Sequence, residues 1–190
     1  GFFAFFATLF PLLATAKYNA ELNFKLSSKL RSYAWPLTYG GCFSITLSIS
    51  FLAYGFVVND FSLLYVAQHS NSQLPVFFKI AAVWGGHEGS LLFWVFSLAL
   101  WSFCIALINR HQKSQFLSHV LMVMNLLILA FVLLTLFTSN PFLRLLPAPF
   151  EGRDLNPMLQ DVGLIFHPPL LYLGYVGFSG VFAFAVAALC

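Results

Sequence analysis

A single histidine stands at the start of an apolar stretch that reads GLIFHPPLLYLGYVGF. Because proline fixes its own φ and disfavours the helical region for the residue before it, the two prolines after His167 predict a helix that begins at Pro168. His167 would then be the N-cap, where the positive end of the helix dipole favours neutral imidazole, the form that binds a metal through its lone pair. The pattern therefore indicates an axial metal ligand held by rigid backbone. The plain alternative is an N-cap histidine that only bonds a backbone N–H or lies at an interface.

A second histidine with possible chemistry lies in the motif WGGHEGS, directly before another apolar stretch. Gly85 and Gly86 permit a close backbone approach or a positive φ, and the adjacent His87 and Glu88 can hydrogen-bond, orient a neighbour or contact the edge of a cofactor. The alternative is a simple helix entry, in which Glu88 or Ser90 caps free backbone N–H groups.

The other histidines and the cysteines carry weaker signals. His69, His111 and His119 lie in polar segments, and we expect them to be solvated. The cysteines fall in apolar stretches without a C-x-x-C spacing, which excludes an encoded zinc site, redox pair or covalent c-type haem attachment; they are Cys42, Cys104 and Cys190.

Composition predicts the elements that must position these residues. The chain is 60% hydrophobic and only 8% charged, so too little polar surface remains for a water-soluble domain. About 20 apolar residues in a helix span a hydrocarbon core of roughly 30 Å. We therefore expect an all-α polytopic membrane protein with about five transmembrane helices, at residues 1–16, 33–58, 91–108, 120–137 and 163–190. The first stretch is short and both ends are apolar, which is typical of a fragment of a longer protein; a cleaved signal peptide is the alternative for residues 1–16.

The distribution of charge predicts the orientation of these spans. Segments 17–32 and 109–119 hold six of the nine basic residues, namely Lys17, Lys25, Lys29, Arg31, Arg110 and Lys113. By the positive-inside rule these segments face the cytoplasm. Loops 59–90 and 138–162, with five of the six acids, are then external, and His167 lies at the outer surface. The net charge of +3 reflects this asymmetry and gives no sign of nucleic-acid binding.

The external loops are long enough to contain short helices. Asp60 is a plausible N-cap for a helix through about Gln68, and Ser72 with Pro75 predicts a second one that ends at Gly85. The second piece has an apolar surface that suits the outer interface or a packed loop.

Proline-rich residues 138–162 contain a third helix start, at Asn156 before a proline. Arg153 could pair with Asp154 or clamp a carboxylate, and Arg144 with Arg153 could meet haem propionates or an anionic lipid headgroup. The last span is rich in rings that suit the flanks of a porphyrin but equally a lipid belt or helix seam; they are Phe166, Tyr172, Tyr175, Phe178, Phe182 and Phe184.

Four stretches together resemble a known family. FVVNDFSLLYVAQHSN, LPVFFKIAAVWGGHEGSLLFW, LFTSNPF and EGRDLNPMLQDVGLIFHPPLLYLGYVGF occur in this order and cover most of residues 56–185. They resemble the N-terminal part of the CcmF family of cytochrome c maturation proteins, the membrane subunit of the bacterial haem lyase. The nitrite-reductase-linked paralogue of this subunit is similar in the same regions.

The resemblance implies a haem-handling protein of the bacterial cytoplasmic (inner) membrane. Such a protein receives haem b at its periplasmic face from the haem chaperone CcmE. It directs thioether formation to the C-x-x-C-H motif of an apocytochrome c, together with a CcmH-type subunit that binds the apocytochrome. No catalytic side chain is implied, because the substrate thiols and the haem vinyl groups carry the chemistry.

The same resemblance assigns roles to individual residues. His167 matches the family histidine that is one axial ligand of the outer haem iron. His87 lies in a matching segment without a known ligand role and stays a candidate, as does Arg153. The tryptophan-rich segment, the second outer axial histidine and the histidine pair for a structural haem b lie downstream in that family. A transporter or channel, and a purely structural assembly subunit, are the alternatives from other functional classes.

Overall fold

The computed structural model describes residues 20–112 and 114–189, and the side chains from residue 33 onward. The long helices in these residues are α2 (Ala20–Val57), α5 (His87–Ile108), α6 (Gln115–Thr138) and α7 (Val162–Leu189). Shorter pieces are α3 (Leu64–His69), α4 (Val76–Ala82) and the 3₁₀ helix η1 (Pro157–Leu159). No strand occurs among the described residues, and the all-α prediction is confirmed. The predicted span at residues 1–16 lies outside the described part of the chain.

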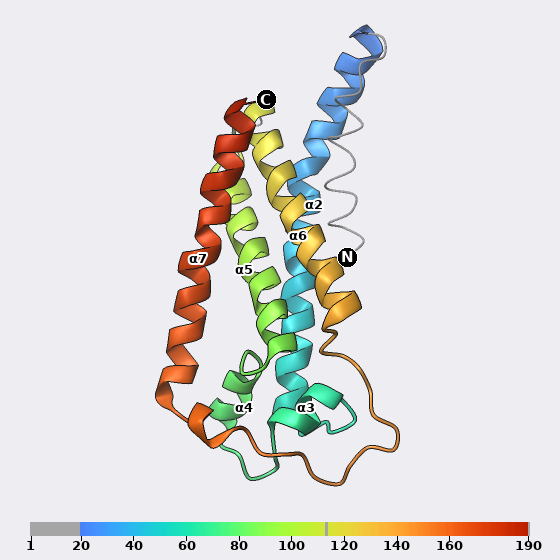
Figure 1. Ribbon diagram of the computed structural model, residues 1–190. Helices are drawn as coiled ribbons and strands as arrows, with labels where there is room; N and C mark the ends of the chain where they lie inside the picture. The colour runs from blue at the N-terminus through green and yellow to red at the C-terminus, as the bar shows by residue number, and fades with distance from the viewer. Residues whose placement is uncertain (1–19, 113, 190) are drawn as a thin grey trace.

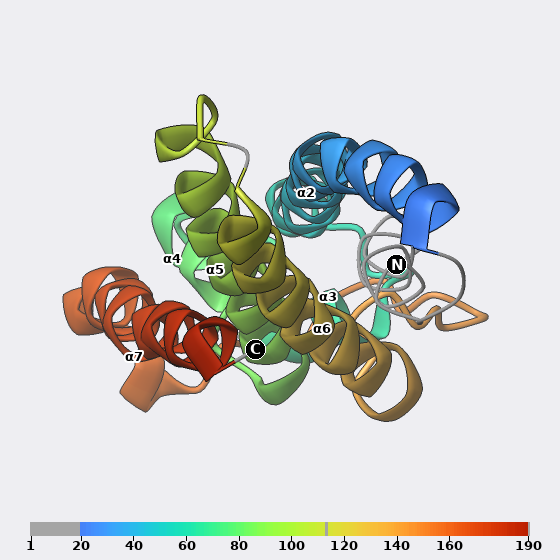
Figure 2. The same ribbon diagram turned by 90° about the horizontal axis from the view of Figure 1, so that it is seen from above.

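The four long helices run alternately in opposite directions along one bundle (Figure 1). Seen along the bundle, α5 and α6 lie between α2 and α7 (Figure 2). Each has a segment long and apolar enough to cross a membrane, and these segments are Tyr33–Val57, His87–Ile108, Gln115–Thr138 and Val162–Leu189. The protein is therefore a multi-pass membrane protein, as predicted.

Helix α2 begins earlier than the sequence pattern indicated. Residues 17–32 were expected to form a basic loop, but the helix already runs from Ala20. Its first turns contain Ala, Glu, Leu and Lys, which are strong helix formers, so the chain stays helical on the polar side of the apolar span.

The bundle packs through small side chains at its centre. Ala99 of α5 and Ala183 of α7 are buried, as is Val176, and they allow the helix backbones to approach closely. The amide of Asn125 on α6 donates to the hydroxyl of Thr38 on α2 at 3.0 Å. This bond satisfies two buried polar groups across a helix interface.

Three of the four tryptophans join separate parts of the bundle by the same kind of bond. Each indole N–H donates to a backbone carbonyl far away in sequence. The donor–acceptor pairs are Trp35 with Ala106 at 3.1 Å, Trp84 with Leu164 at 2.8 Å, and Trp101 with Leu173 at 3.0 Å.

Two segments that connect the helices fold together at one end of the bundle. We call residues 58–86 and 139–161 the cap; it contains α3, α4 and η1 (Figure 1). The amide of Leu64 donates to the carbonyl of Leu143, and the amide of Leu145 donates to that of Ser62, both at 2.8 Å. These bonds surround an isolated antiparallel bridge between Leu63 and Arg144. The cap is therefore a single packed unit and not a pair of free tethers.

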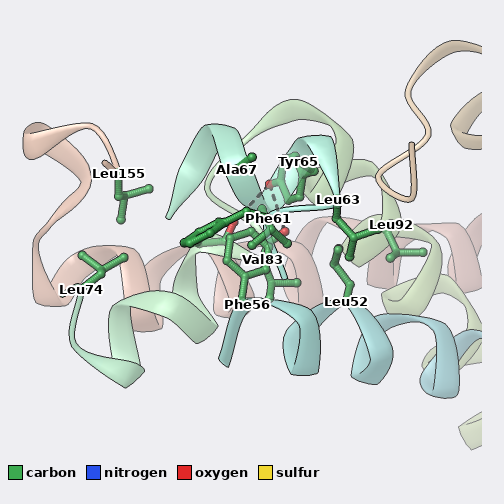
Figure 3. Close-up of a cluster of buried hydrophobic side chains, with 12 residues drawn as sticks. Leu52, Phe56, Phe61, Leu63, Tyr65, Ala67, Leu74, Val83, Leu92 and Leu155 are labelled. Carbon is green, nitrogen blue, oxygen red and sulfur yellow. Dashed lines mark hydrogen bonds between the residues drawn. The ribbon is translucent and has the colours of Figure 1, made fainter. Parts of the chain in front are cut away.

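The cap has its own apolar core, which reaches down to the end of α2 and the start of α5 (Figure 3). Phe56 of α2 meets Tyr65 of α3 edge to face, with ring centroids 5.5 Å apart. Leu155, from the second connecting segment, is buried in the same cluster. Burial of this surface is what holds both segments in place.

The starts of the short helices differ in detail from the prediction. Asp60 does not cap α3; its carboxylate accepts from the amide and the hydroxyl of Ser62, which closes a turn before the helix. Helix α4 does follow Pro75, but it ends at Ala82, before the two glycines. Asn156 caps η1 as predicted, by accepting from the amide of Met158 at 3.1 Å.

Glu151 fastens the two segments of the cap to each other. Its two carboxylate oxygens accept from the amide and the hydroxyl of Ser72, at 2.8 and 2.7 Å. These hydrogen bonds hold the pKa of the Glu151 carboxyl below its usual range, and the buried ammonium of Lys79 acts in the same direction.

The lowered pKa of Glu151 predicts a pH-dependent cap. Because the pKa of Glu151 in the folded protein is below its usual value of 4.5, the stabilisation is present above that pH and is lost as the pH falls through the folded pKa. We expect Glu151→Gln to lower the thermal unfolding temperature at pH 7 and to approach wild type as the pH falls through the lowered pKa of Glu151. Asp154→Asn, which removes a neighbouring exposed carboxylate, is the control. A difference between Glu151→Gln and wild type that does not change with pH would contradict the prediction.

Candidate functional site

His167 lies within α7 and not at its N-cap. The helix begins at Val162, so His167 is its sixth residue, and Pro168 and Pro169 are inside the helix. The predicted start at Pro168 is wrong because Asp161 already caps the helix, its carboxylate accepting from the amide of Gly163 at 2.6 Å. An aspartate directly before an apolar stretch is a helix-start signal in the sequence, and here it outweighs the two prolines.

The prolines are accommodated by a side chain from another segment. In an α-helix the carbonyl of Leu164 would accept from the amide of residue 168, but proline has no N–H and its ring crowds that carbonyl. The indole N–H of Trp84 donates to the Leu164 carbonyl instead, at 2.8 Å. The helix can therefore continue through Pro168 with this carbonyl satisfied.

The place of His167 inside α7 weakens the effect of the helix dipole on its side chain. The helix dipole acts within the first turn, so it has little influence at the sixth residue. The imidazole is nevertheless exposed, and no hydrogen bond or ion pair occupies it in the described part of the chain. The imidazole is therefore free to bind a metal ion from outside this chain.

The surface around His167 is apolar and open. Leu170 and Leu171 follow it at the helical spacing of three and four residues, and they are 67% and 43% exposed. One turn further on, no atom lies within 4 Å of the position that a Cβ on Gly174 would take. An exposed imidazole beside an apolar helix face has the chemistry that would hold haem, which has an apolar ring and an iron that binds imidazole.

The aromatic residues of the last span divide into two groups. Tyr172 faces α5, with its ring 5.4 Å from Phe93 and 5.8 Å from Trp94. The others are exposed, although the Phe184 ring also lies 5.9 Å from that of Phe116 on α6; they are Phe166, Tyr175, Phe178, Phe182 and Phe184. Only this second group could contact a bound porphyrin or the lipid.

Apolar surface continues along α7 in a groove against α5. The groove has a volume of about 560 Å³, and its walls include Trp101, Gly177 and Phe178. None of its lining residues is a metal ligand, so the groove does not supply a second axial position.

His87 is the first residue of α5 and is exposed. The N-cap is Gly86, and no side chain caps the helix there, so the expected capping by Glu88 or Ser90 is wrong. The hydroxyl of Ser90 donates to the carbonyl of Trp84 at 2.9 Å instead. No hydrogen bond or ion pair holds the His87 side chain among the described residues.

Two glycines of the WGGHEGS motif, Gly86 and Gly89, make room for Tyr65. A Cβ on Gly86 would lie 2.9 Å from the Tyr65 ring and 2.6 Å from Nε2 of His69. The hydroxyl of Tyr65 accepts from the amide of Gly86 at 2.9 Å and lies 3.1 Å from the carbonyl of Ala82. Burial raises the pKa of this hydroxyl, so it stays protonated and acts as a donor. Close approach to Tyr65, not a positive φ, is therefore the reason for Gly86.

His69 is packed and not freely solvated as expected. Its Nδ1 lies 3.0 Å from the carbonyl of Tyr65, and its ring lies 4.5 Å from the Tyr65 ring. Only the spacing of four residues between these two rings in one short helix could have signalled this contact.

The two arginines of the second segment behave differently. Arg144 donates to the hydroxyl of Ser62 at 3.2 Å and so belongs to the cap. The backbone amide of Arg153 donates to the carbonyl of Ala67 at 2.6 Å. Its guanidinium is exposed and does not pair with Asp154. Arg153 therefore keeps the free charge that binding an anion would require.

The candidate ligands do not gather into a metal centre. Within residues 20–112 and 114–189, no group of three or more His, Cys, Asp or Glu side chains could hold a metal ion. His167 can thus act only as a single ligand to a group that brings its other coordination with it, as haem does.

The chain is similar to known proteins over almost its whole length. It is 55% identical over 186 residues to the cytochrome c-type biogenesis protein NrfE of Haemophilus influenzae, covering 98% of this chain and 28% of that protein. It is 48% identical over 187 residues to the cytochrome c-type biogenesis protein CcmF of Escherichia coli, again covering 98% of this chain and 28% of the relative. The chain thus spans little more than a quarter of the length of these relatives.

A solved structure and a family model agree with these relatives. The structure of a cytochrome c haem lyase CcmF matches 98% of this chain and 28% of its own chain with a TM-score of 0.75, at 23% identity, which shows a shared fold. The family model described as cytochrome c assembly protein matches residues 84–190, which include both WGGHEGS and the segment around His167. The chain belongs to the cytochrome c assembly protein family.

Proposed function

We propose that this chain is part of the haem-binding membrane subunit of a cytochrome c haem lyase. It takes haem from a periplasmic haem chaperone of the CcmE type and positions it for thioether attachment to the C-x-x-C-H motif of apocytochrome c. The observation that carries this proposal is the exposed, unpartnered imidazole of His167 on an apolar helix face next to the cap. The names of the relatives, which are cytochrome c-type biogenesis proteins, support the same pathway.

The distribution of charge supports an outer position for the cap. The cap lies at the end of the bundle opposite residues 109–112 and the N-terminal turns of α2, which hold basic residues (Figure 1). With these basic segments in the cytoplasm, His167 and the cap face the periplasm. Haem would then be bound at the outer surface of the inner membrane.

The contribution of this chain to the reaction is binding and orientation. Haem, as substrate, supplies the vinyl groups, and the apocytochrome supplies the thiols. His167 would hold the iron at a fixed height, while the apolar face with Leu170 and Leu171 would keep water from one side of the ring. Arg153 is a candidate to receive a propionate, and His87 a candidate contact at the ring edge. Positioning the reacting groups is worth several kcal/mol of the activation barrier without an acid, base or nucleophile from the chain.

The proposal includes partners and a second cofactor. A CcmH-type subunit would present the apocytochrome, and the lipid would cover the exposed rings of α7. Residues outside this chain would supply the second outer axial ligand and the site of a structural haem b.

A second candidate is the nitrite-reductase-linked lyase. The 55% identity to NrfE exceeds the 50% identity to the CcmF of the same organism, H. influenzae, which favours this assignment. The two candidates differ in the apocytochrome that receives haem, and not in the role of His167.

The test of the proposed function is the absorption spectrum of the full-length protein. Purification from membranes should yield a haem band, and His167→Ala should weaken or shift it, together with a loss of holocytochrome c in the cells. A protein without a haem band, or with a band that His167→Ala leaves unchanged, contradicts the proposal. An unchanged spectrum with lost flux of a small solute would indicate a transporter instead.

A further inference from the structure

The turn of α7 that carries His167 is attached to the start of α5 by one side chain. The carbonyl of Leu164 lies three residues before His167, on the neighbouring face of the same turn. It accepts from the indole N–H of Trp84 at 2.8 Å in a half-buried position. The amide hydrogen that would occupy this carbonyl in a regular helix is missing because residue 168 is proline.

Trp84 is itself held in place by contacts with α5. Its carbonyl accepts from the hydroxyl of Ser90 at 2.9 Å, and its ring lies 5.3 Å from that of Phe93. Both partners belong to α5, whose first turn is packed against Tyr65 of the cap. Any displacement of the His167 turn relative to α5 would therefore break the Trp84 bond.

We propose that Trp84 is a positioning residue for His167. Its indole N–H takes the place of the amide hydrogen that Pro168 lacks, and so sets the height and direction of the imidazole relative to the cap. This inference rests on the proposed role of His167 as a ligand of haem iron. Trp84 is proposed to touch neither haem nor substrate, and to act on His167 only through the Leu164 carbonyl.

Trp84→Phe in the full-length protein is the test, because phenylalanine keeps an aromatic ring but has no N–H donor. We expect haem affinity, measured by titration with haemin, to fall about fivefold, the value of one hydrogen bond. The absorption band and the reduction potential of the bound haem should shift as well. In the Pro168→Ala background, where residue 168 again has an amide hydrogen, the same substitution should change haem affinity less than twofold.

Trp101→Phe is the matched control. Trp101 makes the same kind of bond to α7, at the Leu173 carbonyl and 3.0 Å, but further from His167. We expect it to lower the thermal unfolding temperature as Trp84→Phe does, and to leave the haem band and potential in place. A shift of equal size in Trp101→Phe would mean that any loosened contact with α7 disturbs haem, and would overturn the positioning role.

The remaining outcomes separate this inference from the proposed function. Unchanged haem affinity in Trp84→Phe, or an equal loss with Pro168 and with alanine at position 168, overturns the positioning role while His167 remains the ligand. If His167→Ala leaves the haem spectrum unchanged, the proposed function and the positioning role both fail. The bond itself can still be measured then, as the coupling between positions 84 and 168 in thermal unfolding without haem.

Discussion

His167→Gly in the full-length protein is expected to lower the yield of holocytochrome c by at least 10- to 100-fold. Mutating even an outer-shell partner of a metal ligand typically costs that factor in affinity, so loss of the ligand itself should cost no less. Because the imidazole is exposed and unpartnered, its removal leaves no hole in the core and no orphaned polar group. The protein should therefore still fold and insert, and its stability should fall only by the roughly 0.5–1 kcal/mol that glycine costs inside a helix.

Added imidazole tests whether the lost side chain itself is responsible for the lower cytochrome yield. Glycine at position 167 leaves room on an open surface, and free imidazole in the millimolar range should restore part of the haem band and of the cytochrome yield. His111→Gly, which removes an exposed histidine at the opposite end of the bundle, should change neither. A variant at position 167 that keeps full cytochrome yield, or one that imidazole does not rescue while it is folded, would count against iron ligation by this residue.

Gly89→Ala is expected to be the most destabilising conservative change in the WGGHEGS motif, at about 3 kcal/mol. Gly89 is buried in the first turn of α5, and a Cβ there would overlap the carbonyl oxygen of Val83 and lie 2.5 Å from the Tyr65 hydroxyl. Neither neighbour can move alone, because the Tyr65 hydroxyl is bonded to the turn that contains Val83. The cap would have to lift away from α5.

Gly41→Ala is the matched control for this change. Gly41 is also a buried helical glycine, but no atom lies within 4 Å of the Cβ position. Replacing it should stabilise α2 by about 0.5–1 kcal/mol through its greater helix propensity. Thermal unfolding of the two variants in detergent, with limited proteolysis of the cap, measures the difference. Equal unfolding temperatures for the two variants would show that Gly89 is not the contact that seats the cap.

Gly89 and Trp84 show what the WGGHEGS motif does in this fold. Gly86 and Gly89 let Tyr65 and the turn at residues 82–86 come close, and Trp84 reaches the first turns of α7. From the sequence, helix capping by Glu88 or Ser90 and a cofactor contact by His87 were the two alternatives. The first is wrong, and the second stays a prediction.

Apolar content alone determined the class of this protein. Spans of about 20 apolar residues must be helical in a bilayer, since each backbone group has to be satisfied internally, and four of the predicted spans are long helices in the structure. The family, too, could be recognised from ordered motifs, and the match over residues 84–190 confirms it. These properties depend on composition and on motif order, which are visible along the chain.

Local rules failed where a distant partner replaced a local bond. Two prolines predict a helix boundary at residue 168, yet α7 starts six residues earlier because Asp161 caps it and the Trp84 indole, 80 residues away from Leu164, fills the place of the missing amide hydrogen. Likewise, the contact of Ser72 with Glu151 joins segments 79 residues apart. Sequence patterns describe neighbours in the chain, whereas a carbonyl or carboxylate accepts any donor that folding brings near it. The sequence therefore showed His167 to be a candidate metal ligand. Its place in the helix and its open surroundings were decided by the tertiary structure.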